Sequence, residues 1–229
     1  MPNEVRLIIS LLVAFSSLIL VQKFLGKTGV YAWIAICTIL ADVEVTILVR
    51  AFGLEQTLGN TLFAATFLAT DILSEIYGKK ESRNGAIVGI LSTVAFMFFS
   101  FLWQGYIPSE NDWAMPFVKG LFSNTPRMLL ASLVAYAISE ILDVNLYHWI
   151  WDFTEKHSGS REKFLWLRNN CATLISQFVN IVIFNFGAFI GIYDWPTLLQ
   201  VTASCYLIYV FTSLLDTPFI YLARKINKV

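Results

Sequence analysis

Seven long apolar stretches follow one another along this chain of 229 residues, separated by short polar segments. A helix needs about 20 mostly apolar residues to cross the hydrocarbon core of a bilayer. Backbone groups in lipid must be hydrogen-bonded within their own segment, so these stretches predict helices and not strands. We therefore expect an all-α integral membrane protein, a single transmembrane domain over residues 1–229 with about seven helices in one bundle. Their approximate bounds are 5–22, 30–50, 57–77, 85–107, 127–151, 170–193 and 197–223.

The composition agrees with this pattern. Hydrophobic residues make up 57% of the chain and charged residues only 14%, whereas a soluble domain has about 25% charged residues. The formal net charge is +0, so no basic field attracts nucleic acid and no nucleic-acid partner is expected. Cys37, Cys171 and Cys205 lie far apart in apolar runs, which predicts neither a disulfide nor a metal site. No cofactor is expected.

The lysine and arginine residues are distributed unevenly between the polar segments. If the N-terminus is outside, twelve of the sixteen fall on internal segments, as the positive-inside rule requires. This predicts an external N-terminus, an internal C-terminus and an odd number of spans. The longest external loop is expected at 108–126, where Trp113, Phe117 and Phe122 suit the membrane surface. The internal residues are Lys23, Lys27, Lys79, Lys80, Arg83, Lys156, Arg161, Lys163, Arg168, Arg224, Lys225 and Lys228.

Acidic residues, by contrast, occur inside the predicted helices, where a charge costs about 2.5–3.5 kcal/mol near the helix centre. All basic residues fall in loops or at helix ends, so no lysine or arginine is expected as a partner within the membrane. We infer that the acids face the bundle interior and meet a proton, water or a solute rich in hydrogen-bond donors. They are Asp42, Glu44, Asp71, Glu75, Glu140, Asp143 and Asp216.

Residue spacing places several of these polar side chains on shared helix faces. Residues three or four apart are neighbours on a helix surface. Three stripes of this kind predict a polar cavity inside the bundle, and Asp42, near the middle of its own helix, is expected to face it. The stripes are Asp71 with Glu75, Glu140 with Asp143, and Gln177 with Asn180.

Other roles stay open for some members of this set. Glu75 lies four residues before Lys79 and suits an ion pair with it. Gln177 and Asn180 also suit hydrogen bonds between helices, without any ligand. Asp216 precedes a Thr-Pro step and suits a role at a proline kink.

Two partial motifs near the N-terminus do not hold. Gly26-Lys27-Thr28 resembles the end of a phosphate-binding loop, but the leading glycine would be at position 21, which is valine. The first stretch resembles a secretory signal, but Glu4 lies close to it and no small-x-small site precedes Lys23, so we expect a retained helix. The motifs HExxH, GxSxG and GxGxxG are absent from the sequence. Any energy input would come from a gradient, from trapping of the solute or from another subunit.

Four stretches stand out as blocks. They are FLATDILSEIYGKK at 67–80, ASLVAYAISEILDV at 131–144 after Pro126-Arg127, WLRNN at 166–170 with Thr173, Ser176 and Gln177, and LDTPFIY at 215–221. In order and spacing they resemble the hallmark segments of the queuosine precursor transporter family, also called the vitamin uptake transporter family. The resemblance covers roughly residues 35–225.

The resemblance implies a multi-pass protein of the cell membrane that imports a 7-deazaguanine for tRNA modification. The candidates are 7-cyano-7-deazaguanine (preQ0), 7-aminomethyl-7-deazaguanine and queuine. A guanine-type edge presents two adjacent donors to a carboxylate, and such charge-assisted hydrogen bonds are strong. Trp103, Tyr136 or Tyr206 would stack on the base, and Gln104 would read a further edge. The expected substrate-binding residues are Asp42, Asp71, Glu75, Trp103, Gln104, Glu140, Asp143, Gln177 and Asn180.

The chain departs from the family pattern at positions that bear on the substrate. The pattern Ser-Gln-x-x-Asp-Thr reads Ser-Gln-Phe-Val-Asn-Ile at 176–181, so Asn180 replaces an acid. A lysine expected in the last helix is Tyr209. The joint loss of an acid and a base suggests that neutral groups have replaced an ion pair. The site would then be tuned to another deazaguanine or to another small heterocycle.

Two other classes of function remain open. The chain also suits the substrate-binding subunit of a multi-component vitamin importer, because it has seven short helices and no ATP site. The second class is an intramembrane enzyme that uses the carboxylates as an acid–base pair, but the motifs of such enzymes are lacking and no catalysis is expected. The expected partners are a small deazaguanine solute and the lipid bilayer, with a homodimer as one option.

Overall fold

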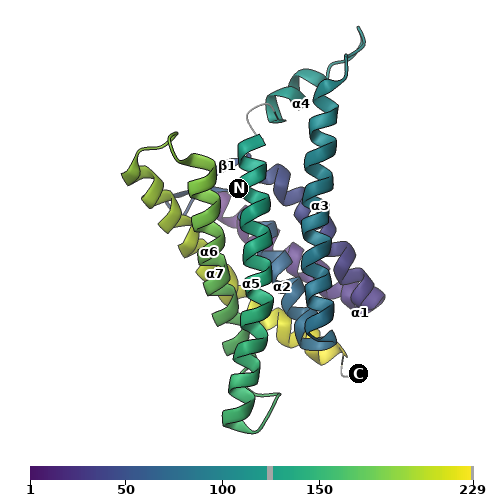
Figure 1. Ribbon diagram of the computed structural model, residues 1–229, viewed down its shortest axis with the longest axis vertical. Helices are drawn as coiled ribbons and strands as arrows, with labels where there is room; N and C mark the ends of the chain where they lie inside the picture. The colour runs from purple at the N-terminus through teal and green to yellow at the C-terminus, as the bar shows by residue number, and fades with distance from the viewer. Residues whose placement is uncertain (123–125, 228–229) are drawn as a thin grey trace.

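The structure, a computed structural model, describes residues 1–122 and 126–227, and most of these residues are helical (Figure 1). Lys228, which the charge count placed inside, lies outside the described residues. Within the described part of the chain, five helices are long and apolar enough to cross a membrane, namely α1, α3, α5, α6 and α7. The predicted class, a helical membrane protein, is therefore confirmed. The helices are α1 (Asn3–Glu44), α2 (Asn60–Tyr77), α3 (Lys79–Gly105), α4 (Met115–Phe122), α5 (Pro126–Ser158), α6 (Leu165–Phe189) and α7 (Trp195–Asn227).

The first helix, α1, is folded back on itself. A straight helix of its 42 residues would separate the two ends by about 60 Å. Asn3 nevertheless donates a hydrogen bond to the carbonyl of Arg50 at 2.9 Å, and Figure 1 shows the N-terminus beside β1. The reversal occurs at Gly26, whose φ of 58° and ψ of −145° suit glycine. The two halves, 3–25 and 27–44, correspond to the first two predicted helices.

A β-hairpin follows α1, and the prediction of helix over residues 45–50 is wrong. Strand β1 (Leu48–Ala51) pairs antiparallel with β2 (Leu54–Thr57). The run VTILV at 45–49 is rich in β-branched residues, which favour strands. Phe52 and Gly53 form a two-residue turn with φ values of 53° and 74°, as tight hairpins of this kind require. The next predicted helix therefore begins at Asn60 instead of residue 57.

Helix α2 lies at the centre of the bundle. Most of its 18 residues are buried, and it packs against α1, α3, α5 and α7. Protein therefore shields it from lipid, so that its polar side chains face other helices. Small residues allow this close packing. For example, a Cβ atom at Gly85 of α3 would crowd the side chain of Leu73 of α2.

The long helices extend beyond the predicted bounds at one end of the bundle. Helix α5 continues to Ser158 instead of residue 151, and α6 begins at Leu165 instead of residue 170. Hydropathy ends a span where polar residues begin, although the helix itself continues into the polar region. This difference places Arg168 inside α6 instead of in a loop.

The two ends of the bundle differ in character. The hairpin end holds the start of α1, the hairpin, the starts of α2, α5 and α7, and the short helix α4. The basic end holds the Gly26 turn, the starts of α3 and α6, and the ends of α5 and α7. At the basic end Lys27 pairs with Glu81 at 3.3 Å, and Arg224 pairs with Glu162 at 3.3 Å. The short helix α4 lies in the region 108–126 that was predicted as a loop.

The outer surface of the bundle is apolar. Large hydrophobic side chains on the outer faces of α3, α5 and α7 are strongly exposed, as lipid contact requires. The interior, by contrast, holds many buried polar and charged side chains. The exposed examples include Ile87, Leu91, Phe101, Leu130, Ile141, Leu207 and Leu214.

Candidate functional site: a buried polar column

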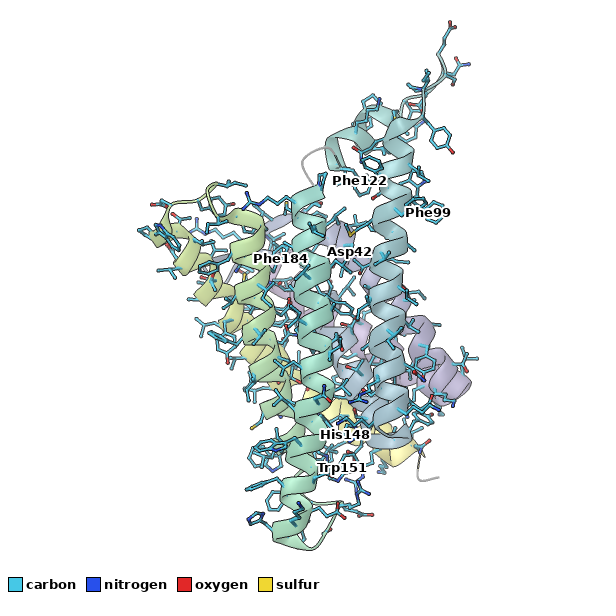
Figure 2. The ribbon with its side chains drawn as sticks, in the orientation of Figure 1. Asp42, Phe99, Phe122, His148, Trp151 and Phe184 are labelled. Carbon is cyan, nitrogen blue, oxygen red and sulfur yellow. The ribbon has the colours of Figure 1, made fainter. Side chains whose placement is uncertain are left out.

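Polar side chains of α2 form one wall of a column that runs through the bundle interior, which we call the polar column. From the hairpin end to the basic end, α2 presents Asn60, Thr66, Thr70, Asp71 and Glu75. At 1.5 Å per residue these positions extend over about 22 Å of helix. The other walls come from α1, α5, α6 and α7. Figure 2 shows Asp42 and Phe184 toward the hairpin end and Trp151 toward the basic end.

Asp71 and Asp143 form the centre of the column. The Thr173 hydroxyl donates to Asp71 Oδ2 at 3.2 Å, and the Ser176 hydroxyl donates to Asp143 Oδ1 at 2.7 Å. The two carboxyl groups lie beside one another and interact directly. Asp71 Oδ1 and Asp143 Oδ2 find no donor among the described residues. Two neighbouring buried carboxylates repel each other strongly, so the pair is expected to share a proton or to receive a donor from a ligand.

Glu140 lies next to this pair and faces α2. Thr66 and Thr70 each donate a hydroxyl hydrogen bond to it, both at 3.1 Å, and its side chain is fully buried. The Tyr136 ring, one turn earlier on α5, packs against Phe63 with ring centroids 5.6 Å apart. The predicted stripe of Glu140 and Asp143 therefore faces the same interior space as Asp71.

Two further acids line the column above and below this centre. Asp42 of α1 accepts a hydrogen bond from the Ser132 hydroxyl of α5 at 3.3 Å, and its Oδ2 has no donor among the described residues. Asp216 of α7 accepts one from the Asn169 amide of α6 at 2.8 Å. Both side chains are almost fully buried, as are those of Asp71, Glu140 and Asp143.

Glu75 has a different environment, which corrects two expectations. Arg168 of α6 binds it in a bidentate manner, with Nη2 at 2.8 Å from Oε1 and 2.7 Å from Oε2. The Tyr147 hydroxyl donates to it at 2.9 Å, and Arg224 lies 3.5 Å away. The proposed pair with Lys79 is not formed, and a buried arginine does serve as partner. The sequence analysis missed Arg168 as a partner because it placed the start of the sixth helix after this residue.

The guanidinium group of Arg168 is held firmly. It lies 4.2 Å from the centroid of the Trp151 ring and donates to the Lys163 carbonyl at 2.8 Å. Its side chain is 0% exposed and that of Glu75 only 4% exposed. This ion pair joins α2 to α6 and closes the basic end of the polar column.

A small cavity lies at the hairpin end of the column. Its volume is about 20 Å³, enough for about one water molecule. Asn180 lines it and donates to the Gln177 carbonyl oxygen at 3.2 Å, while Gln177 Nε2 finds no acceptor among the described residues. The lining residues are Val45, Thr57, Asn60, Phe63, Ser132, Asn180, Ile181, Phe184, Asn185, Cys205 and Tyr209. We call it the amide cavity.

Trp103 and Gln104 do not join the polar column. Trp103 packs against Phe96 and Phe122, with ring centroids 6.3 and 6.2 Å apart, and is 42% exposed. Gln104 donates to the Ser100 carbonyl of its own helix at 3.2 Å. Both lie in the last turns of α3 beside α4. A hydropathy profile shows where in a helix a residue lies, but not which face of the helix carries it. The sequence therefore could not show that these two side chains point away from the column.

The hydroxyl and amide donors of the column were largely missed by sequence reasoning. Thr66, Thr70 and Asn169 each donate to a buried acid. A usable signal was present, since Thr66 and Thr70 are four residues apart and lie on one face of α2. Threonine is common in transmembrane helices, however, so the spacing alone does not show that the two hydroxyl groups bind an acid. That role becomes clear only when Glu140 is seen opposite them.

Comparisons with known proteins place the column in a family context. The model of the family described as "Putative vitamin uptake transporter" matches residues 57–223. A relative from Bacillus subtilis (strain 168), described as "Probable queuosine precursor transporter", is 34% identical over 217 residues. That alignment covers 93% of this chain and 91% of the relative. No solved structure matches the chain. The range matched by the family model, 57–223, includes all the acids of the polar column except Asp42.

Proposed function

Because the chain belongs to the vitamin uptake transporter family, we propose that it imports a precursor of queuosine across the cell membrane. The substrate class comes from the name of the relative from Bacillus subtilis, and the candidates are the 7-deazaguanines named above. The observation that carries the proposal is the polar column itself, because buried ionisable groups within membrane helices commonly mark a solute or ion path.

The proposed topology has seven spans with the N-terminus outside. The spans are the two halves of α1, then α2, α3, α5, α6 and α7. The basic residues gathered near the Gly26 turn and the end of α7 support an internal basic end. The first residues of the chain and Ala223, which accepts a hydrogen bond from Gln22, lie at opposite ends of the bundle, as an odd number of spans requires.

The centre of the column suits a solute with several hydrogen-bond donors. Asp71, Glu140 and Asp143 present carboxyl groups, and two of these acids keep an oxygen without a donor among the described residues. The paired donors of a guanine-type edge match such a group, and an aminomethyl substituent adds a cation that the acids favour. Asp42, Gln177 and Asn180 extend the proposed path toward the hairpin end. Trp103 and Gln104 stay predictions without support from the geometry.

Import requires that the two ends of the column open in turn. The Glu75–Arg168 pair closes the basic end, and the amide cavity at the other end is water-sized, so a heterocycle cannot pass through this conformation. Glu75 is therefore proposed as part of the internal barrier and not as a direct substrate ligand. Val45, just before the hairpin, and Thr57, the last residue of β2, form the corresponding external cover.

Uptake in cells tests the proposal. The chain is expressed in a host that cannot make the deazaguanine precursor, a single candidate base is supplied, and queuosine in tRNA is measured. Queuosine should accumulate with the wild-type chain and fall about tenfold or more with Asp71→Asn or Glu140→Gln. Glu110→Gln, an exposed acid outside the helices, serves as the matched control.

Two results would contradict parts of this account. Absence of queuosine with the wild-type chain for every candidate base would remove the proposed substrate class. Unchanged accumulation in Asp71→Asn and Glu140→Gln, at equal protein levels, would remove the proposed path while leaving the function intact.

A further inference from the structure

The amide cavity has a composition unlike that of the acidic centre. None of the described residues that line it carries a charge, and three of them are asparagines from two helices, Asn60, Asn180 and Asn185. Each amide offers both a donor and an acceptor. The cavity can therefore pair with a neutral group that has donors and acceptors on one edge, which a cluster of carboxylates alone cannot do.

The amide NH2 group of Asn60, in the cavity wall, has no hydrogen-bond acceptor among the described residues. Asn60 is 8% exposed, and its carbonyl oxygen accepts from the Tyr209 hydroxyl at 3.2 Å and from the Thr57 hydroxyl at 3.3 Å. Its Nδ2 group finds no hydrogen-bond acceptor among the described residues, although the Cys205 thiol, a weak acceptor, lies near it. An unpaired buried donor is unfavourable because it has lost its hydrogen bonds to water. A ligand with an acceptor would satisfy it.

Aromatic side chains complete the lining. Phe63, Phe184 and Tyr209 come from three different helices and all border the same cavity. Stacking of a planar base on aromatic rings is a common source of affinity in nucleic-acid binding proteins. Amides at the edge of a ring and aromatic groups at its faces are the elements by which proteins read a heterocyclic base.

The cavity adjoins both the acidic centre and the hairpin end. Asn180 bonds to Gln177 one turn deeper on α6, and Ser132 of the cavity wall bonds to Asp42. Val45 and Thr57 close it on the side of the hairpin, whose tip is tied to α1 through a bond from the Phe52 amide to Glu4. The cavity has room for only about one water molecule, so a ring can enter only when this cover moves.

We propose that the amide cavity binds the neutral heterocyclic ring of the substrate, with Asn60 and Asn180 pairing to its edge and Phe63 and Phe184 contacting its faces. The inference rests on the proposed function and assigns its ring-recognition step to this cavity. The acidic centre then receives the donors or the cationic substituent of the same solute. Loss of one edge partner should lower affinity for every deazaguanine, whether its substituent is neutral or charged.

Binding to purified variants tests this assignment, with 7-cyano-7-deazaguanine as the neutral probe. Asn60→Ala and Asn180→Ala should each raise the dissociation constant about tenfold. Asn170→Ala is the matched control, because Asn170 lies on the same helix as Asn180, is also 7% exposed and bonds only to α6 and α7 outside the cavity. It should alter stability but not affinity.

A second measurement uses the wild-type chain and does not depend on variant folding. Cys205 lines the cavity, whereas Cys171 does not. The probe should slow alkylation of Cys205 by a small maleimide, measured by mass spectrometry, and leave Cys171 unchanged. Cys205 that reacts only after denaturation would show that the cavity never opens, and would overturn the inference.

The outcomes separate the two proposals. If the wild-type chain binds no deazaguanine, the proposed function fails. If it binds the probe while both asparagine variants bind equally tightly and Cys205 is not protected, the cavity assignment fails and the proposed function stands.

Discussion

At the scale of single residues, each acid of the polar column accepts at least one hydrogen bond from a neighbouring side chain. Asp42, Glu140 and Asp143 each accept from a hydroxyl group, and Asp216 accepts from an amide. Such bonds offset part of the cost of taking a carboxyl group out of water. One oxygen of Asp71 and one of Asp143 have no donor among the described residues, so a proton or a ligand donor would be stabilised most at these two atoms.

The Glu75–Arg168 pair makes a sharp prediction about stability. Glu75→Ala leaves a fully buried guanidinium group without its anion, which should cost about 3–5 kcal/mol of unfolding free energy. The double variant Glu75→Gln, Arg168→Met removes both charges and should recover much of that loss. Thermal unfolding in detergent compares the two, and equal losses in both would argue against a coupled pair.

Gly89 offers a second prediction. An added Cβ would overlap the Tyr136 hydroxyl, whose ring is 1% exposed and cannot easily move away. Gly89→Ala should therefore lower stability by about 1–3 kcal/mol and disturb Glu140 beside the tyrosine. Gly105→Ala of the same helix has open space around the new methyl group and should be nearly neutral. Similar unfolding temperatures for the two variants would refute the close contact.

Some of this detail was predictable and some was not. The sequence predicted that Asp71, Glu140 and Asp143 face a common interior, because spacing fixes which residues share a face. It could not predict Arg168 as the partner of Glu75, because the pairing depends on where α6 begins. The placement of Asn180 and Tyr209 on one cavity agrees with the expectation that these two positions are neighbours.

At the scale of elements, the hairpin is the feature that hydropathy alone could not show. An apolar run of β-branched residues reads equally well as the end of a buried helix or as a strand. In the structure, the tight turn at Phe52 and Gly53 lets this run pair with β2 as a strand. Residues 45–50, predicted as the end of a span, therefore lie at the hairpin, and Val45 borders the amide cavity.

Docking of the hairpin should depend on pH through Glu4, which precedes the apolar stretch 5–22 and so lies outside the membrane-spanning segment. The pKa of this carboxyl is lowered from its ordinary value of 4.5 because it accepts hydrogen bonds from its own backbone N–H and from that of Phe52. A lowered pKa in the folded state means that the stabilisation is present above pH 4.5 and is lost as the pH falls through the lower value.

Hydrogen exchange at residues 48–57 measures this effect. Protection factors, which correct for the intrinsic pH dependence of amide exchange, should fall in the wild-type chain as the pH drops below 4.5. Glu4→Gln should exchange faster at neutral pH and lose most of the pH dependence. A hairpin equally protected in both proteins at neutral pH would show that Glu4 does not hold it.

At the scale of the whole molecule, an apolar shell encloses a polar interior that is closed at both ends. The uneven distribution of the basic residues between its two ends predicts a topology with the N-terminus outside. A green fluorescent protein fused after α7 should fluoresce, and alkaline phosphatase inserted near residue 110 should be active, since each reporter works on only one side of the membrane. The opposite pattern would invert the proposed direction of the two gates.

The most direct test of the central claim is transport by the purified chain alone. Liposomes that contain only this protein should accumulate radiolabelled 7-cyano-7-deazaguanine faster than empty liposomes, and Asp143→Asn should reduce the initial rate about tenfold. Uptake by the lone chain would also exclude the role of a binding subunit in a larger importer. A rate equal to that of empty liposomes, or one unchanged by Asp143→Asn, would contradict the view that the buried polar column carries the solute.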